Sequence, residues 1–126
     1  MDVNGHKLFM RCAGSGSPTV VLEAGLGDAS GVWSQVQEPL GHDTRVCSYD
    51  RWGNGNSGAG PTHQRNPLEA VSDLHDLLRN AGICPPYVLV GHSYGGLLAR
   101  LFAQTCFSRS VPMGPWPAKA HEKRSY

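Results

Sequence analysis

Three short runs of apolar residues stand out along the chain, at residues 19–24, 45–50 and 87–91. Each run is nearly continuous rather than alternating, which indicates a strand buried on both faces. Segments with helical spacing lie between the runs and after the last one. Strand and helix in alternation predict an α/β fold, in which right-handed crossovers join the strands of a parallel sheet.

The first and last helical segments are recognised by their apolar faces. In the first, Trp33, Val36 and Leu40 share one face, and Gly41 stands where the helix should stop. The last is predicted to start at Gly95 and to run on through Leu97, Leu98, Leu101 and Phe102.

The middle helical segment carries signals at both ends. Asn66 is suited to cap it, Pro67 to the first helical position, and Glu69 to the return bond of a capping box. Gly82, followed by two prolines, predicts its end. The positions expected on its apolar face are Leu68, Val71, Leu74, Leu78 and Ala81.

The two ends of the chain differ from its body. An Asn4-Gly5 dipeptide, which supplies the positive φ angles of a tight turn, predicts a β-hairpin between Val3 and residues 7–12. After Gln104 the composition changes to three prolines and four basic residues against one acid, with no periodic apolar pattern. We therefore predict one domain over residues 1–104 and a divergent, disordered tail at 105–126.

Composition and charge exclude several classes of function. With 126 residues, 40% hydrophobic and 17% charged, the chain fits one globular domain or a piece of one. A net charge of +1 gives no basis for binding nucleic acid. No apolar run approaches the roughly 18 residues of a membrane span, and no leader segment is recognisable. We expect a cytoplasmic protein that acts on a small molecule, without a cofactor or metal; the oligomeric state stays open.

The four cysteines, Cys12, Cys47, Cys84 and Cys106, lie far apart and form no C-x-x-C pair. We expect free structural thiols in such a protein, with a metal site or a disulfide as the alternative.

The sharpest chemical signal is Gly91-His92-Ser93-Tyr94-Gly95, a G-x-S-x-G motif between an apolar strand and a helix. A nucleophilic serine needs a sharp, strained turn to raise its hydroxyl above the sheet, and Gly91, Gly95 and Gly96 leave room for that turn. The motif predicts Ser93 as a nucleophile. The alternative is a phosphate-binding glycine turn, which lacks the lysine of a P-loop.

Two further glycine-rich segments follow the first two strands. At residues 23–27, the backbone N–H of Leu26 is expected to form an oxyanion hole with that of Tyr94, the alternative being an ordinary turn. At residues 49–57, Asp50 and Arg51 are expected to make hydrogen bonds and an ion pair that shape the loop beside the site, rather than to act in catalysis.

These segments resemble the α/β-hydrolase family, and in particular its branch of small esterase-like and peptidase-like enzymes. The resemblance rests on VVLEAGLG, YDRWGNGNS and VGHSYGG, and extends over residues 2–104. It implies that Ser93 is the nucleophile and that Leu26 and Tyr94 supply the oxyanion hole. One departure is Glu23-Ala24-Gly25, where many members have a histidine before the glycine.

A larger departure concerns the rest of the catalytic triad. In this family the acid and then the histidine follow the nucleophile, whereas here only His121 and Glu122 follow it, adjacent and in the opposite order. We do not expect them to form a triad. For the earlier histidines we expect structural or surface roles: His6, His42, His63, His75 and His92.

The resemblance therefore implies the N-terminal portion of a hydrolase domain, over residues 1–104, in a truncated chain without the later strands and the lid. Two functions stay open. One is a serine hydrolase acting on an ester or related acyl bond, with esterase, lipase, amidase and peptidase as its possible classes. The other is an inactive fragment with a binding or complementing role. A nucleotide-binding module is disfavoured because the first core strand lacks the glycine fingerprint.

Overall fold

The computed structural model describes residues 2–3, 6–52, 55, 57 and 66–106 of the chain. Its strands are β1 (Asp2–Val3), β2 (His6–Lys7), β3 (Phe9–Ala13), β4 (Thr19–Glu23), β5 (Val46–Asp50) and β6 (Tyr87–Gly91). Its helices are the 3-10 turn η1 (Ser30–Trp33) and the α-helices α1 (Ser34–Leu40), α2 (Pro67–Asn80) and α3 (Tyr94–Cys106). The three predicted core strands and the alternating helices are thus confirmed.

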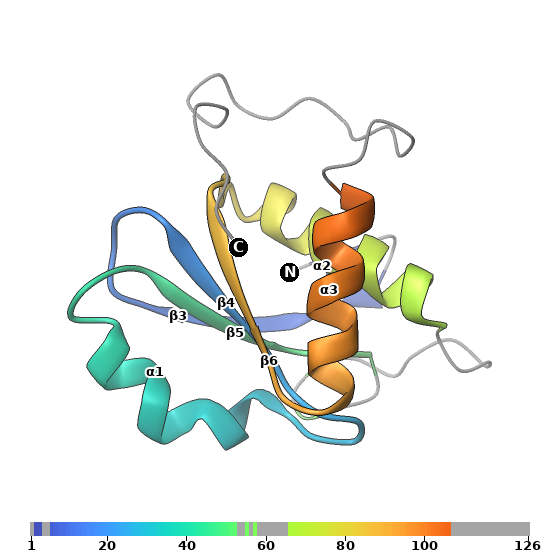
Figure 1. Cartoon of the computed structure of the whole chain (residues 1–126), viewed down its shortest axis with the longest axis horizontal. Coiled ribbons are helices and arrows are strands. Elements are labelled where there is room, and N and C mark those ends of the chain that lie inside the picture. The colour runs from blue at the N-terminus through green and yellow to red at the C-terminus, as the bar shows by residue number, and fades with distance from the viewer. Residues whose placement is uncertain (1, 4–5, 53–54, 56, 58–65, 107–126) are drawn as a thin grey trace.

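The main sheet has the strand order β3-β5-β4-β6 (Figure 1). Strands β5, β4 and β6 are parallel, and β3 pairs antiparallel with β5 at one edge. All residues of β4 and β5 are buried, as their continuous apolar runs predict. The fold is therefore α/β with a mixed sheet, in which β4 lies between two parallel neighbours.

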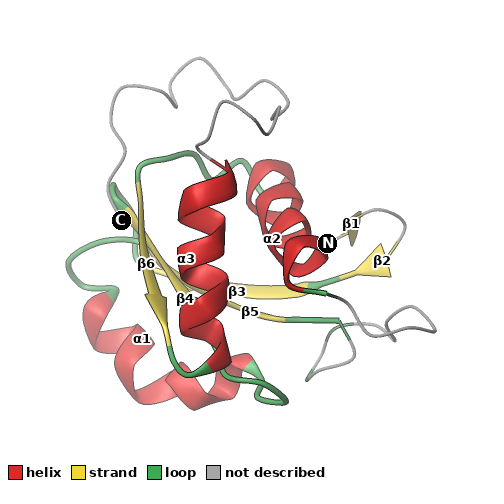
Figure 2. Ribbon diagram, turned by 45° about the vertical axis from the view of Figure 1, so that its right-hand side comes forward, coloured by secondary structure: helices red, strands yellow, loops and turns green. Residues whose placement is uncertain are grey.

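The helices form a layer on each side of the sheet (Figures 1 and 2). Alternate residues of β4 separate the two layers, because successive side chains of a strand point to opposite faces. Val21 packs in the core cluster that includes α2 and α3. Val20 and Leu22 form the smaller cluster with Val46 of β5, and Trp33 and Leu40 pack against it.

The N-terminal hairpin is shorter than predicted. Asp2 pairs with Lys7 and Val3 with His6, which confirms the hairpin, while its Asn4-Gly5 turn lies outside the described residues. The expected long arm at residues 7–12 is wrong, since β3 leaves the hairpin and joins β5 over five residue pairs. Strand β3 finds more backbone hydrogen-bond partners along the whole length of β5 than along the two residues of β1.

Helix α2 begins and ends as predicted. The Asn66 side chain accepts a bond from the Glu69 N–H, and the Glu69 carboxylate accepts one from the Asn66 N–H, which completes the capping box. At the other end Gly82 has φ 72°, and its N–H and that of Ile83 donate to carbonyls of the last helical turn. Leu68 is 60% exposed, so its predicted place on the apolar face is wrong. It lies six residues before Leu74, which is about 120° around the helix.

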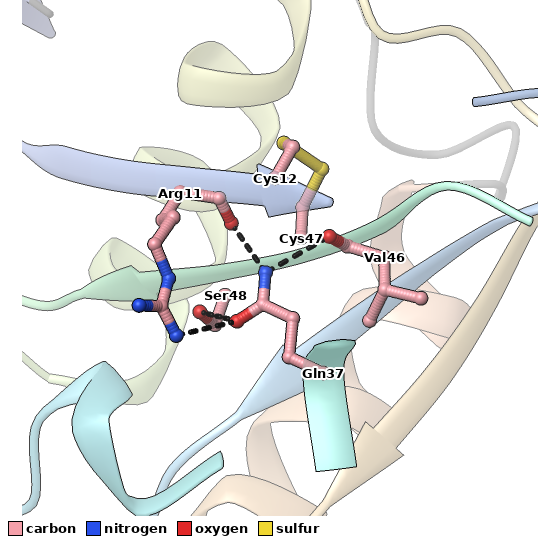
Figure 3. The surroundings of a disulfide bond; sticks show 6 residues. All are labelled: Arg11, Cys12, Gln37, Val46, Cys47 and Ser48. Atoms are coloured by element: carbon pink, nitrogen blue, oxygen red, sulfur yellow. Dashed lines mark hydrogen bonds between the residues drawn. A yellow bond between two sulfur atoms is a disulfide. The ribbon is translucent and has the colours of Figure 1, made fainter. Parts of the chain in front are cut away.

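Helix α1 buries a glutamine where an apolar residue was expected. Val36 is 47% exposed, whereas Gln37 is fully buried. The Gln37 amide nitrogen donates to the carbonyls of Arg11 and Val46, and its oxygen accepts from Ser48 Oγ at 2.7 Å (Figure 3). These bonds satisfy a polar group that would otherwise cost free energy in the core. The prediction for Val36 is therefore wrong.

Cys12 and Cys47 form a disulfide across the β3–β5 pair (Figure 3). The two residues stand directly opposite each other in the antiparallel register, with 4.1 Å between their Cα atoms. The expectation of free thiols is therefore wrong for this pair and holds for Cys84. Because the two cysteines lie 35 residues apart in the sequence, their contact becomes evident only from the strand pairing.

The end of the described chain extends α3 beyond the predicted domain boundary. Thr105 and Cys106, which the sequence assigned to the tail, still belong to this helix, and Thr105 Oγ1 donates to the Leu101 carbonyl at 2.7 Å. The remaining predicted tail, residues 107–126, lies outside the described residues. None of the helices in the described ranges is long and apolar enough to cross a membrane.

Replacing Gln37 should destabilise the fold. Gln37→Leu leaves Ser48 Oγ and two strand carbonyls without this partner, and we expect it to lower the free energy of unfolding by about 2 to 4 kcal/mol. Gln35→Leu on the exposed side of α1 is the matched control. Urea unfolding compares the two, and equal midpoints would contradict the role assigned to Gln37.

The unpaired edge of strand β6 leads us to predict that copies of the chain associate with one another. It lies at the edge of the sheet, no described residue pairs with its outer side, and it carries no charge. Val90, 37% exposed, adds apolar surface there. We expect the chain to associate at micromolar concentration in sedimentation experiments and Val90→Lys to reduce the effect, whereas Val32→Lys on η1 should not. A monomeric chain that unfolds reversibly would speak against this.

Candidate active site

Ser93 lies at the abrupt turn between β6 and α3. Its φ of 56° is positive, which strains a residue with a side chain, and among the described residues no other non-glycine has such an angle. The Gly95 N–H donates to the His92 carbonyl and the Gly96 N–H to that of Ser93, both at 2.9 Å, so the helix begins at once. The sharp strand-to-helix turn predicted at Ser93 is confirmed, and its side chain is exposed.

Two of the three glycines around Ser93 are required by close backbone contacts. A Cβ on Gly91 would lie 2.4 Å from the Gly95 oxygen, and one on Gly95 would lie 2.1 Å from the Glu23 oxygen. A Cβ on Gly96 would meet nothing closer than 3.7 Å. Gly91 and Gly95 therefore leave room for the turn as predicted, whereas the space around Gly96 would admit a side chain.

The segment that leads to Leu26 follows β4 and lies beside the residues that precede Ser93, because β4 and β6 are adjacent parallel strands. Glu23 and Gly91, the last residues of these strands, are paired in register, and the His92 N–H donates to the Glu23 carbonyl at 3.1 Å. Neither the Leu26 N–H nor the Tyr94 N–H donates a hydrogen bond to a residue that the structure describes. Both predicted oxyanion donors thus lack an acceptor among the described residues, and their role stays a prediction.

Glu23 is fully buried beneath this edge of the sheet. The Tyr49 hydroxyl donates to Glu23 Oε2 at 2.7 Å, and Arg51 Nη1 lies 3.1 Å from Oε1. Burial raises the pKa of Glu23 to about 7, while the Tyr49 hydrogen bond and the Arg51 charge act in the opposite direction. Burial and the nearby Glu23 charge raise the pKa of Tyr49.

Arg51 ties the end of β4 to the start of α3. Its Nη1 also donates to the Ala24 carbonyl at 2.8 Å, and its Nη2 donates to the Gly25 carbonyl at 2.6 Å. Its guanidinium carbon lies 5.4 Å from the centre of the Tyr94 ring. Arg51 thus forms an ion pair and hydrogen bonds beside the site as predicted, but its ionic partner is Glu23 of β4 rather than Asp50.

Asp50 shapes the turns beneath the site. Its Oδ1 accepts the Ser30 N–H at 2.6 Å, at the start of η1. Its backbone carbonyl accepts from the Ser57 hydroxyl, which in turn accepts the Phe9 N–H. The predicted structural role of Asp50 is confirmed by these contacts.

The structure shows no hydrogen bond between Ser93 Oγ and any of the described histidines. Ser93 Oγ makes no hydrogen bond with a described residue, and His75 lies in the buried face of α2, where burial lowers its pKa. His92 Nδ1 lies beside Gly25, 3.1 Å from where a Cβ would stand. His63, His121 and Glu122 lie outside the described residues. In the described part of the chain, no group of three His, Cys, Asp or Glu residues could hold a metal ion.

The Glu23–Tyr49 contact was not predicted. The signal available in the sequence was an acid at the end of an otherwise apolar run, because such an acid needs a partner if the run is buried. The partner, Tyr49, lies on the adjacent strand 26 residues away. Sequence spacing alone does not identify it.

The pKa of Glu23 predicts how stability changes with pH. Because this pKa is raised from 4.5 to about 7, the folded state binds more protons than the unfolded state between these values, and the contribution of Glu23 to stability falls as pH rises through them. Relative to Glu23→Gln, the parent chain should lose up to about 3 kcal/mol over this interval. Urea unfolding at several pH values measures the difference. Glu38→Gln, an exposed glutamate of α1, controls for loss of a charge, and parallel profiles for parent and Glu23→Gln would argue against a raised pKa.

Comparison with known proteins gives the same family for sequence and structure. The family model described as alpha/beta hydrolase fold matches residues 18–112. The probable transporter efuK of Hormonema carpetanum is 36% identical over 105 residues, which are 79% of this chain and 15% of that protein. The putative carbamate hydrolase RutD of Yersinia enterocolitica is 32% identical over 123 residues, which are 93% of this chain and 44% of that protein.

Among solved structures, the enol-lactonase from Burkholderia xenovorans LB400 superposes with a TM-score of 0.69 at 30% identity, over 76% of this chain and 37% of that one. The chain thus spans less than half the length of each of these three relatives. Because the family model covers most of the chain and the described residues form part of the corresponding fold, the chain belongs to the α/β-hydrolase family.

Proposed function

We propose that this chain carries the nucleophile half of a serine hydrolase site that acts on an ester or a related acyl bond through Ser93. The observation that carries the proposal is the exposed Ser93 at a φ of 56°, held between the end of β6 and the start of α3. A serine tolerates this strain where the turn serves the chemistry of its hydroxyl. Leu26 and Tyr94 support the proposal, since neither of their N–H groups donates to a residue that the structure describes.

The chemistry proceeds through an acyl-enzyme. Ser93 Oγ attacks the acyl carbon and loses its proton to a base, while the carbonyl oxygen takes up negative charge. The N–H groups of Leu26 and Tyr94 stabilise that oxygen, and one such donor is worth about 3 to 4 kcal/mol in the transition state. The bond to the leaving group then breaks, and water releases the acyl group from Ser93.

The substrate class is proposed from the relatives. RutD is named a putative carbamate hydrolase, and the Burkholderia protein an enol-lactonase. Both names imply cleavage at a carbonyl carbon, which agrees with a small acyl substrate here. Esterase, lipase, amidase and peptidase activities stay open. The cytoplasmic location and the lack of a nucleic-acid partner stay predictions from the sequence.

We further propose that the triad acid and histidine come from outside the described residues. Ser93 Oγ has no hydrogen-bond partner among those residues, and the chain spans less than half of its relatives. These facts support residues 1–104 as the N-terminal portion of a larger hydrolase domain. They also favour the second function, a fragment that is inactive alone and complements a piece carrying the base.

The purified chain should have near-background activity. Loss of the triad histidine costs about 10⁶ in kcat where it has been measured, or ~8 kcal/mol, because a serine hydroxyl is a weak nucleophile without a base. We expect the chain and Ser93→Ala to give equal signals with a fluorophosphonate probe and with an activated ester. Labelling of the chain that Ser93→Ala abolishes would instead place a base within this chain, and His121→Ala would then test His121.

Adding a base distinguishes a chain that is inactive because it lacks the histidine from a chain in which Ser93 is not the nucleophile. Imidazole at high concentration replaces the missing histidine as a diffusible proton acceptor. We expect slow fluorophosphonate labelling that depends on imidazole and is absent in Ser93→Ala, with the modified peptide identified by mass spectrometry. Ser110→Ala, in the predicted tail, is the matched control. Failure of imidazole to promote labelling of Ser93 would contradict its role as nucleophile.

A further inference from the structure

Arg51 contacts both segments that carry the proposed oxyanion donors. Its Nη2 donates to the carbonyl of Gly25, which precedes Leu26, at 2.6 Å. Its guanidinium carbon lies 5.4 Å from the centre of the ring of Tyr94, the first residue of α3. The Arg51 side chain is only 11% exposed, so these contacts are held within the protein.

The bond to Gly25 bears directly on the Leu26 N–H. The Gly25 carbonyl and the Leu26 N–H belong to one planar peptide unit and point in opposite directions. A donor that fixes the oxygen therefore fixes the direction of the N–H as well. A charged donor also polarises the peptide unit, which strengthens the N–H as a hydrogen-bond donor.

The backbone here needs such a restraint. Gly25 has no side chain to limit its rotation, and Gly27, two residues on, has φ 78°. The Asp28 N–H also donates to the Gly25 carbonyl, at 3.1 Å, and closes the turn. That bond is longer and uncharged, so it restrains the Gly25 carbonyl less than the bond from Arg51 does.

Arg51 is itself held in place by Glu23. The Glu23 carboxylate is fully buried and lies 3.1 Å from Arg51 Nη1, and the same nitrogen donates to the Ala24 carbonyl at 2.8 Å. Three acceptors thus receive bonds from the two terminal nitrogens of one guanidinium. The single ammonium of a lysine does not reproduce this rigid fork.

We propose that Arg51 is a positioning residue of the hydrolase site, which orients the Gly25–Leu26 peptide so that its N–H faces the oxyanion formed at Ser93. Contact with the Tyr94 ring holds the second donor, at the start of α3, in a fixed relation to the first. The proposal rests on the proposed function for its chemical purpose. The orientation of the peptide is testable without catalysis.

The first test is NMR of the ¹⁵N-labelled full chain. In Arg51→Met, which keeps a long side chain without charge or donors, we expect the Leu26 amide resonance to move. The amides of α1 and α2 should stay in place, and the Leu26 signal should stay in place in the control Arg100→Met on the exposed side of α3. An unchanged Leu26 resonance in Arg51→Met overturns the proposal.

Arg51→Lys provides an independent test if Arg51→Met does not fold. A purely structural role, neutralising Glu23, would be rescued by lysine. We therefore expect Arg51→Lys to restore the urea midpoint but not the position of the Leu26 resonance. Recovery of both by lysine overturns the positioning role.

The second test is the rate of imidazole-dependent phosphonylation of Ser93. We expect Arg51→Met to slow it by about 10² or more, the effect of losing one oxyanion donor. If the parent chain is labelled and Arg51→Met is labelled equally fast, the positioning role fails while the proposed function stands. If the parent chain is never labelled, the proposed function fails, and the Leu26 resonance still decides whether Arg51 orients the peptide.

Discussion

Glu23 joins the three strands whose ends form the site. Its carboxyl accepts the Tyr49 hydroxyl from β5 and pairs with Arg51, and its backbone carbonyl accepts the His92 N–H beyond β6. The same carbonyl lies where a side chain on Gly95 would collide, so α3 starts directly against it. A buried carboxyl without partners would cost several kcal/mol, and these contacts offset that cost. These contacts at the end of β6 and the start of α3 hold Ser93 at its strained φ.

Elements marked by local signals could be predicted closely from the sequence. Strand β6 has its predicted bounds, and the Asn66 cap and the Gly82 stop of α2 lie where the residue types demanded. These features depend on the backbone preferences of a few consecutive residues. The turn at Ser93 belongs to the same class, because glycines and the change from strand to helix are visible within five residues.

What the sequence did not reveal depends on which segments meet in space. The pairing of β3 with β5 places Cys12 opposite Cys47, and it also brings the Arg11 carbonyl within reach of Gln37. Gln37 then takes the buried position of α1 and leaves Val36 outside. No local pattern distinguishes a glutamine bonded to Arg11, Val46 and Ser48 from one in solvent, because those partners come from strands before and after it.

The Cys12–Cys47 disulfide determines whether the two pieces of a proteolytically cut chain stay joined. The loop at residues 14–17 is exposed, and the two cysteines stand on either side of it, 35 residues apart. A protease that nicks this loop severs the backbone between β3 and β4 but does not release the N-terminal piece. The nicked protein would migrate as a single band in a denaturing gel without reductant and as two bands once thiol is added. The segment that carries the N-terminal hairpin is thus joined covalently to β5 through the disulfide as well as to the loop that follows β3.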